Sequence, residues 1–146
     1  MNAIAAAAIV WTRRKLSDEA ARYLANLPMT HEEVDLLFVH ADASAPARWN
    51  YVTGQAAARI SLAATPARIT FCGHVHIPQL HCLSATGKLV SHSPVTDVPV
   101  PLAKQRQWLA VIGSVGQPRD GNPAASFATY DTERREITYR RAPYDV

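Results

Sequence analysis

The sequence contains few cysteines and no long hydrophobic run. Of its 146 residues, only Cys72 and Cys82 are cysteines, which is too few for the disulfide framework of a small secreted domain. No apolar stretch approaches the roughly 20 residues that a membrane-spanning helix requires. The apolar run near the amino end has no cationic segment before it, unlike a signal peptide. These absences predict a cytoplasmic protein with a single globular unit and no membrane span.

The sequence also lacks a block of charge of one sign. Its formal net charge is +3, and arginine supplies most of the positive charge. Arg134, Arg135, Arg140 and Arg141 lie close together and could form a nucleic-acid patch, but they flank and alternate along a predicted strand without a recognised binding module. A solvated strand face is the interpretation we prefer, and nucleic acid is not an expected partner.

Hydrophobic periodicity predicts a mixed α/β protein. Ser17 is a typical N-cap, and Asp18 and Glu19 follow it in the positive first turn of the second helix. In the third helix, Ala56, Ile60 and Ala63 are expected to face inward. The predicted helices span residues 3–14, 17–27 and 53–64, and the predicted strands span residues 34–39, 69–72, 80–84, 88–92, 107–112, 126–130 and 136–141.

Two of the predicted strands lead into histidines. The run V-D-L-L-F-V ends at His40, and I-T-F-C-G leads into His74 and His76, with Gly73 expected to provide the sharp turn between strand and histidines. A predicted helix separates the two strands, so the arrangement is β-α-β and the strands should be parallel. Because ligands of open α/β sheets gather at the carboxyl ends of the strands, we expect the three imidazoles to converge there on a metal.

A structural zinc site is a rival interpretation of the same region. Its ligands would be Cys72, His74 or His76, His81 and Cys82. The spacings do not match the usual paired zinc-binding loops, and adjacent residues of a strand point to opposite faces. The two cysteines are better explained as small buried hydrophobic residues.

Four segments of the chain resemble one known family. The sequence G-H-V-H at 73–76 is similar to the G-H-x-H motif of the calcineurin-like metallophosphoesterases, in particular the bacterial branch with diadenosine-tetraphosphatase-like and related phosphodiesterases. Residues 2–16, with W-T-R at 11–13, the L-F-V-H at 37–40 and the G-S-V-G-Q-P-R-D-G-N-P at 113–123 resemble successive segments of that branch in the same order.

The resemblance implies a fold and an activity. The fold would be the C-terminal half of an α/β/β/α sandwich, a mixed sheet with flanking helices, so that residues 1–146 form a partial metallophosphoesterase domain. The activity would be hydrolysis of phosphoesters or phosphoanhydrides at a site with two divalent metal ions, either manganese, iron, zinc or nickel. By motif position, His40 and His74 would serve one ion and His76 the other. The substrate would be a phosphorylated small molecule or a nucleotide.

Several features of that family have no counterpart in this sequence. The Asp-x-His, Gly-Asp-x-x-Asp and Gly-Asn-His motifs, which supply most metal ligands and the proton donor, are absent. No catalytic residue is therefore retained, and we expect the chain alone to hydrolyse phosphoesters negligibly, to bind metal weakly, and to self-associate or to be complemented by the missing N-terminal half. The alternative is a non-catalytic remnant or binding module that keeps the half-fold.

Two further residues give rise to predictions. Arg119, in the loop 113–123, could meet a substrate phosphate bidentately, or it could simply pair with Asp120 or another carboxylate. Ala41 occupies a position where relatives usually have glycine. If that position needs a positive φ, Ala41 costs about 1 kcal/mol or shifts the loop, which makes His40 the least secure of the three ligands.

Overall fold

The computed structural model describes residues 3–145 and has two sheets and three α-helices in that range. The helices are α1 (Ala3–Lys15), α2 (Asp18–Ala25) and α3 (Gln55–Ala63), with a short 3-10 helix η1 (Pro46–Arg48). The strands are β1 (Thr30–Glu33), β2 (Leu36–Val39), β3 (Ile69–Cys72), β4 (Gln79–Leu83), β5 (Leu89–His92), β6 (Pro99–Pro101), β7 (Gln107–Val111), β8 (Ala125–Asp131) and β9 (Glu136–Ala142). None of these helices is long and apolar enough to cross a membrane.

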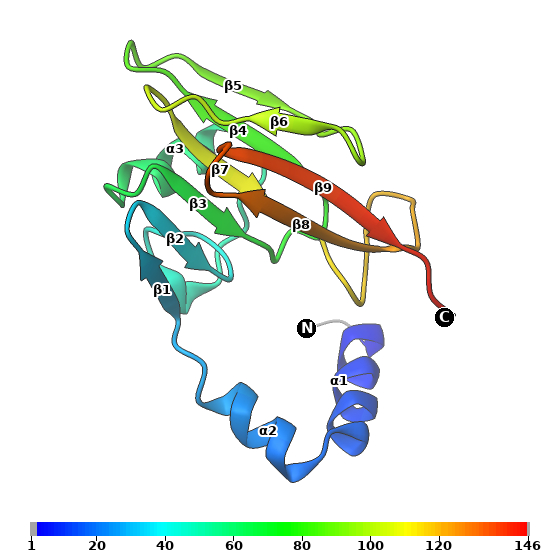
Figure 1. Cartoon of the computed structure of the whole chain (residues 1–146). Coiled ribbons are helices and arrows are strands. Elements are labelled where there is room, and N and C mark those ends of the chain that lie inside the picture. Colours follow the sequence, from blue (N-terminus) through cyan, green and yellow to red (C-terminus); the bar gives the residue numbers. More distant parts are fainter. Residues whose placement is uncertain (1–2, 146) are drawn as a thin grey trace.

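The strands form a six-stranded mixed sheet and a three-stranded sheet. The order in the large sheet is β1-β2-β3-β7-β4-β5, and the order in the small sheet is β6-β9-β8. Helix α3 covers one face of the large sheet and the small sheet covers the other (Figure 1). Strands β2 and β3 are parallel and are joined through α3. The predicted mixed α/β architecture and the β-α-β unit are therefore confirmed.

Strand β7 shows how the two faces of the large sheet are filled. Trp108 and Ala110 belong to the apolar cluster against the small sheet, while Leu109 and Val111 belong to the cluster under α3. This alternation follows from the two-residue period of a strand. Because both faces are covered, the strand is apolar at four consecutive positions instead of every second one.

The two cysteines lie on opposite faces of the large sheet. Cys72 packs in the cluster under α3 and Cys82 in the cluster against the small sheet, and both are buried free thiols. Burial raises the pKa of Cys72 to about 12. The rival zinc interpretation fails, because the faces of the sheet separate its ligands.

Two local predictions were wrong. Helix α3 buries Ala58, Ser61 and Leu62, whereas Ile60, which was expected to face inward, is 59% exposed. The hydroxyl of Ser61 explains the rotation, since it accepts a hydrogen bond from the backbone N–H of Ala43 at 3.0 Å. Strand β1 was not predicted, because its sequence T-H-E-E is exposed at every position and carries no apolar alternation.

The C-terminal arginines pair with carboxylates. Arg135 lies 3.4 Å from Asp35, Arg140 lies 3.2 Å from Asp97, and Arg141 pairs with Asp120. The side chain of Arg141 is 14% exposed, so it is mostly withdrawn from solvent, and the prediction of a solvated strand face holds only in part.

Helices α1 and α2 form an arm that stands apart from the sheets (Figure 1). The side chain of Ser17 caps α2 as predicted, accepting a hydrogen bond from the backbone N–H of Ala20 at 3.1 Å. No residue of α2 is buried. The arm leaves apolar side chains in contact with solvent, among them Trp11, Tyr23, Leu24 and Leu27.

Candidate functional site

Two of the three predicted histidine ligands meet at the carboxyl ends of neighbouring strands. His40 follows β2 and His74 follows β3 by two residues. The backbone N–H of Gly73 donates to the carbonyl of His40 at 3.0 Å, which continues the strand pairing up to the histidines. The Nε2 atom of His40 then lies 3.1 Å from the Nδ1 atom of His74.

The backbone at the histidine motif is strained in a way that the sequence did not indicate. His74 has φ 62° and His76 has φ 65°, whereas Gly73, expected to take the unusual angle, does not have a positive φ. The N–H of Val75 donates to the carbonyl of Gly73 at 2.7 Å, closing a three-residue turn centred on His74. A positive φ at the centre of such a turn marks the strained form of the γ-turn. Strained non-glycine residues of this kind cluster at functional sites.

His76 is held by the loop between β7 and β8. Its Nδ1 atom lies 2.7 Å from the carbonyl oxygen of Gln117. Because a carbonyl oxygen only accepts hydrogen bonds, Nδ1 carries the proton, and in the neutral ring Nε2 is unprotonated. The backbone N–H of Arg119 donates to the carbonyl of His76 at 3.0 Å. The guanidinium of Arg119 donates to the side-chain oxygen of Gln117 at 3.1 Å. His76 and Arg119 therefore belong to one local structure.

Burial and positive neighbours lower two histidine pKa values at this site. Burial is the main cause for His40, and the imidazoles of His74 and His76 lower its pKa further. Burial also lowers the pKa of His76, and the guanidinium of Arg119 adds to this effect, while the bond to Gln117 opposes it. Both effects favour neutral imidazole, which is the form that binds metals.

The loop that follows His40 is organised by a buried carboxylate. Asp42 is 5% exposed, and it accepts hydrogen bonds from the backbone N–H of Ser44 at 3.0 Å, from the hydroxyl of Ser44 at 2.5 Å and from the amide of Asn50 at 3.4 Å. Burial alone would raise the pKa of Asp42, but the hydrogen bonds outweigh it and hold the pKa below its usual range. Asp42 therefore ties the two ends of the loop together.

Ala41 does not cause the strain that we expected. It is buried, and it does not have a positive φ. The left-handed residue of this loop is instead Trp49, with φ 56°, directly after η1. The conditional cost assigned to Ala41 does not arise, and the position of His40 is supported by its pairing with Gly73.

The same loop brings two aromatic rings against the histidine pair. The ring of Tyr51 stacks on the imidazole of His74, with centroids 4.2 Å apart and an interplanar angle of 17°. The indole of Trp49 lies 4.6 Å from the ring of His40 and 5.7 Å from the ring of His74. Sequence analysis did not place Trp49 and Tyr51 at the site, because nothing in their spacing indicates what they contact.

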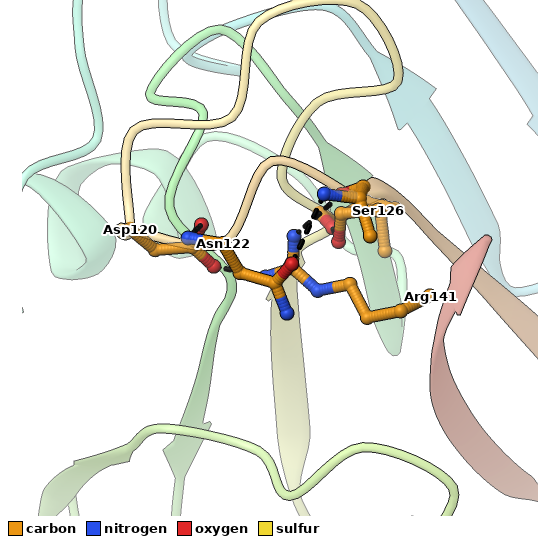
Figure 2. Close-up of polar contacts among 6 residues, drawn as sticks. Asp120, Asn122, Ser126 and Arg141 are labelled. Atoms are coloured by element: carbon orange, nitrogen blue, oxygen red, sulfur yellow. Dashed lines mark hydrogen bonds and ion pairs between the residues drawn. The ribbon is translucent and has the colours of Figure 1, made fainter. Parts of the chain in front are cut away.

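The loop after β7 is fastened at its far end by Arg141. Figure 2 shows Asp120, Asn122, Ser126 and Arg141 gathered at the base of this loop. The guanidinium of Arg141 pairs with Asp120 and donates to the carbonyl of Ala124 at 3.0 Å. The hydroxyl of Ser126 donates to the carbonyl of Ile112 at 2.8 Å. Because Asp120 pairs with Arg141, the predicted alternative partner of Arg119 is already engaged.

An apolar groove opens beside the histidine pair. Its volume is about 790 Å³, and its lining includes Leu24, Met29, Phe38, His40, Trp49 and Phe71. The rings of Phe38 and Phe71 stack with centroids 5.1 Å apart, yet Phe38 remains 37% exposed. The groove thus lies where the small sheet stops covering the large sheet, next to the arm.

The histidines share one region without forming a complete coordination shell. His40 and His74 are in contact, and His76 is close enough to affect the pKa of His40. Across residues 3–145, no three or more histidine, cysteine, aspartate or glutamate side chains lie close enough together to hold a metal ion. The metal assignment of the three histidines stays a prediction, as does the phosphate contact of Arg119.

Comparisons with known proteins support the fold. No family model matches the sequence. The chain is 31% identical, over 149 aligned positions, to an uncharacterised protein of Methanocaldococcus jannaschii, an alignment that covers 99% of this chain and 58% of the relative. The crystal structure of a metallophosphoesterase from Sphaerobacter thermophilus superposes with a TM-score of 0.80 at 28% identity, covering 99% of this chain and 60% of that one. The chain spans about three fifths of both proteins, and over that part it has the fold of a metallophosphoesterase.

Proposed function

We propose that this chain supplies the imidazole side of a metal-dependent phosphoesterase site that hydrolyses phosphoesters or phosphoanhydrides. The observation that carries the proposal is the contact between His40 and His74 at the carboxyl ends of β2 and β3. The similarity to the metallophosphoesterase of Sphaerobacter thermophilus supports it.

The geometry of the pair suits two ligands of one ion. Imidazole nitrogens bind divalent metals such as zinc at about 2.0–2.1 Å. Two ligands that subtend an angle between a right angle and the tetrahedral angle are then about 2.9–3.4 Å apart. The separation of 3.1 Å between Nε2 of His40 and Nδ1 of His74 falls within that range.

The state of His76 suits a ligand of a second ion. Metal-binding histidines usually donate the other ring N–H to a carboxylate or a backbone carbonyl, which fixes the tautomer and the orientation of the ring. The contact from Nδ1 of His76 to Gln117 has this form. When two divalent ions are bound, the chemistry that they supply is activation of water and neutralisation of the phosphoryl oxygens.

Arg119 is the proposed contact for the substrate phosphate. Its guanidinium lowers the pKa of His76, so it lies within electrostatic range of that imidazole. Its side-chain hydrogen bond goes to the neutral side chain of Gln117, and none of the ion pairs within residues 3–145 includes it. A guanidinium in this position favours a phosphorylated small molecule or a nucleotide as substrate.

The remaining ligands would come from polypeptide that covers the groove. The relatives extend beyond the matched region by about two fifths of their length, and the groove has apolar walls that lead to the histidines. We therefore commit to one occupant, a polypeptide that corresponds to that unmatched part. A second copy of this chain is the alternative that the experiment distinguishes.

The test is a complementation assay. Hydrolysis of bis-p-nitrophenyl phosphate with added Mn²⁺ is measured for this chain alone, for the unmatched part of the Sphaerobacter protein alone, and for the mixture, with light scattering to report mass. We expect turnover only in the mixture, and none in a mixture with His74→Ala. The matched control His92→Ala removes an exposed histidine and should leave turnover unchanged.

Other results would overturn parts of the proposal. Turnover by this chain alone would mean that the ligands are misplaced. A stable mixed complex without turnover would favour the non-catalytic binding module. A homodimer of this chain that does not bind the added polypeptide would show that the proposed occupant of the groove is wrong. For the phosphate contact, Arg119→Ala should raise KM in the active mixture with little change in kcat.

A further inference from the structure

The loop of residues 41–52 presents its aromatic rings on a fixed support. Asp42 joins the start of the loop to Asn50 near its end, and Val52 is buried under α3 at 2% exposed. The N–H of Ala43 is bound to Ser61 of α3 at 3.0 Å. The support therefore holds both ends of the loop, so the rings that it carries have a defined place against the histidine pair.

The aromatic rings are not explained by core packing. Tyr51 is 49% exposed and Trp49 is 47% exposed, although aromatic side chains usually contribute to a core by being removed from water. One face of the Tyr51 ring lies on the imidazole of His74 in a nearly parallel stack. Trp49 is tilted by 52° against the imidazole of His40 and packs edge-to-face, at 68°, against that of His74. The half-exposed rings thus contact the histidine pair.

The imidazole of His74 needs such a contact to be oriented. Within residues 3–145, the imidazole of His74 makes one hydrogen bond, with His40, whereas His76 is oriented by the backbone carbonyl of Gln117. Its backbone is in a strained turn, which sets the position of Cβ but leaves the rotation of the ring open. A stacked ring restricts that rotation. A carbonyl orients His76, and an aromatic face is the equivalent support for His74.

We propose that Tyr51 is a positioning residue that holds the imidazole of His74 with Nδ1 directed at His40, with Trp49 closing the side of the pair. The role of this orientation rests on the proposed function, since a fixed ring would help metal binding only if His74 is a metal ligand. The stacking of Tyr51 on His74 does not itself depend on a metal. The phenol hydroxyl plays no part, because the contact is made by the ring face.

The test compares Tyr51→Leu with Tyr51→Phe by NMR of the histidine ring protons. Stacking under a tyrosine ring shifts the His74 ring protons upfield relative to those of the exposed His92. Tyr51→Phe should keep that shift and the proton contacts between the rings of His40 and His74, and Tyr51→Leu should lose both. Tyr23→Leu, which removes a tyrosine that is 66% exposed on the arm, is the matched control and should change neither.

A second measurement is the affinity for Zn²⁺ by titration calorimetry. Loss of a residue that orients a ligand typically weakens metal binding by 10-fold to 100-fold, so we expect about 10-fold weaker binding for Tyr51→Leu, rescue in Tyr51→Phe, and an unchanged melting temperature in both. A purely structural role would lower the melting temperature and would not distinguish the two variants in this way.

The two proposals fail in different ways. Unchanged His74 shifts in Tyr51→Leu, or altered shifts with unchanged Zn²⁺ affinity, would overturn the positioning role. If the wild-type protein and His74→Ala bind Zn²⁺ equally, the metal assignment fails, and the NMR comparison still decides whether Tyr51 sets the orientation of the ring.

Discussion

Helices α2 and α3 are nearly equal in length and differ in what surrounds them. Helix α2 has 8 residues and buries none of them, whereas α3 has 9 residues and buries Ala58, Ser61 and Leu62 against the large sheet. Both sequences are amphipathic, and α2 also has a well-formed N-cap. An apolar stripe on a helix therefore indicates that the helix can pack against something, but it does not identify the partner. In this protein the large sheet covers the apolar face of α3, and the apolar face of α2 remains exposed.

Removing a leucine from each helix should give the largest contrast. Leu62→Ala deletes a side chain that is 0% exposed, and we expect it to lower the free energy of unfolding by about 3–4 kcal/mol through lost burial and a cavity. Leu24→Ala, at 51% exposed, should cost at most about 0.5 kcal/mol. Urea denaturation followed by circular dichroism measures both. Equal costs would mean that the arm packs on the sheets in solution.

Gly113→Ala tests whether the rigidity of the core extends into the loop after β7. Gly113 has φ 97°, and an added Cβ would lie 2.6 Å from Oγ and 2.8 Å from Cβ of Ser126. We expect a loss of about 3 kcal/mol from backbone strain and steric overlap together. Gly116→Ala is the control, since it has open space around it. Similar melting temperatures for the two variants would contradict the close packing of the loop on β8.

The pH dependence of stability should come from the core. Burial, and to a smaller extent the charge of His92, lower the pKa of His81 to about 4, from 6.5 in an exposed histidine. The unfolded chain therefore binds more protons than the folded chain between these values, so stability is complete above pH 6.5 and falls as the pH is lowered toward 4. Because the side chain is fully buried, the loss should reach roughly 2–3 kcal/mol.

Variants of His81 and His92 check this assignment of the titrating group. His81→Leu should flatten the pH profile between 6.5 and 4, and His92→Gln should leave most of it. The remaining slope in His81→Leu measures the contribution of other groups. If His81→Leu keeps the full slope, the titrating group lies elsewhere.

The smallest expected effect belongs to the arm. Ser17→Ala removes the N-cap of α2, worth about 1 kcal/mol of helix stability. Because a helix of this length is marginal without packing, the amides of α2 should exchange with solvent faster while the melting temperature of the core stays the same. Ser17→Asp keeps an acceptor and should keep the protection. A parallel loss of core stability would show that arm and core unfold together.

The sequence predicted the strands well where apolar residues are concentrated in them. The strand 69–72 and the strands that form the hairpins β4-β5 and β8-β9 were all predicted within one residue of their observed bounds. Strand β1 was missed because an exposed edge strand has no apolar alternation to detect. The buried face of α3 was assigned wrongly because Ser61 is buried by a hydrogen bond that joins it to a distant loop.

The candidate site could be predicted in its chemistry but not in its geometry. The positions of His40 and His74 followed from strands that end in histidine, since parallel strands bring their carboxyl ends together. The stacking of Tyr51 on His74 depends on the course of a loop that Asp42 closes through its hydrogen bonds. Such a course is the sum of several specific contacts, and none of them leaves a periodic signal in the sequence.

The position of β7 has a consequence for synthesis on the ribosome. This strand comes late in the chain, yet it lies at the centre of the large sheet between β3 and β4. While the chain emerges, β3 and β4 have no common partner until residues 107–111 have left the exit tunnel. Until then the nascent protein can form only the β1-β2-β3 and β4-β5 pieces as separate units. We therefore expect the apolar surfaces of β3 and β4 to stay exposed from their own synthesis until residues 107–111 have emerged, which makes this chain a candidate for chaperone binding during that interval.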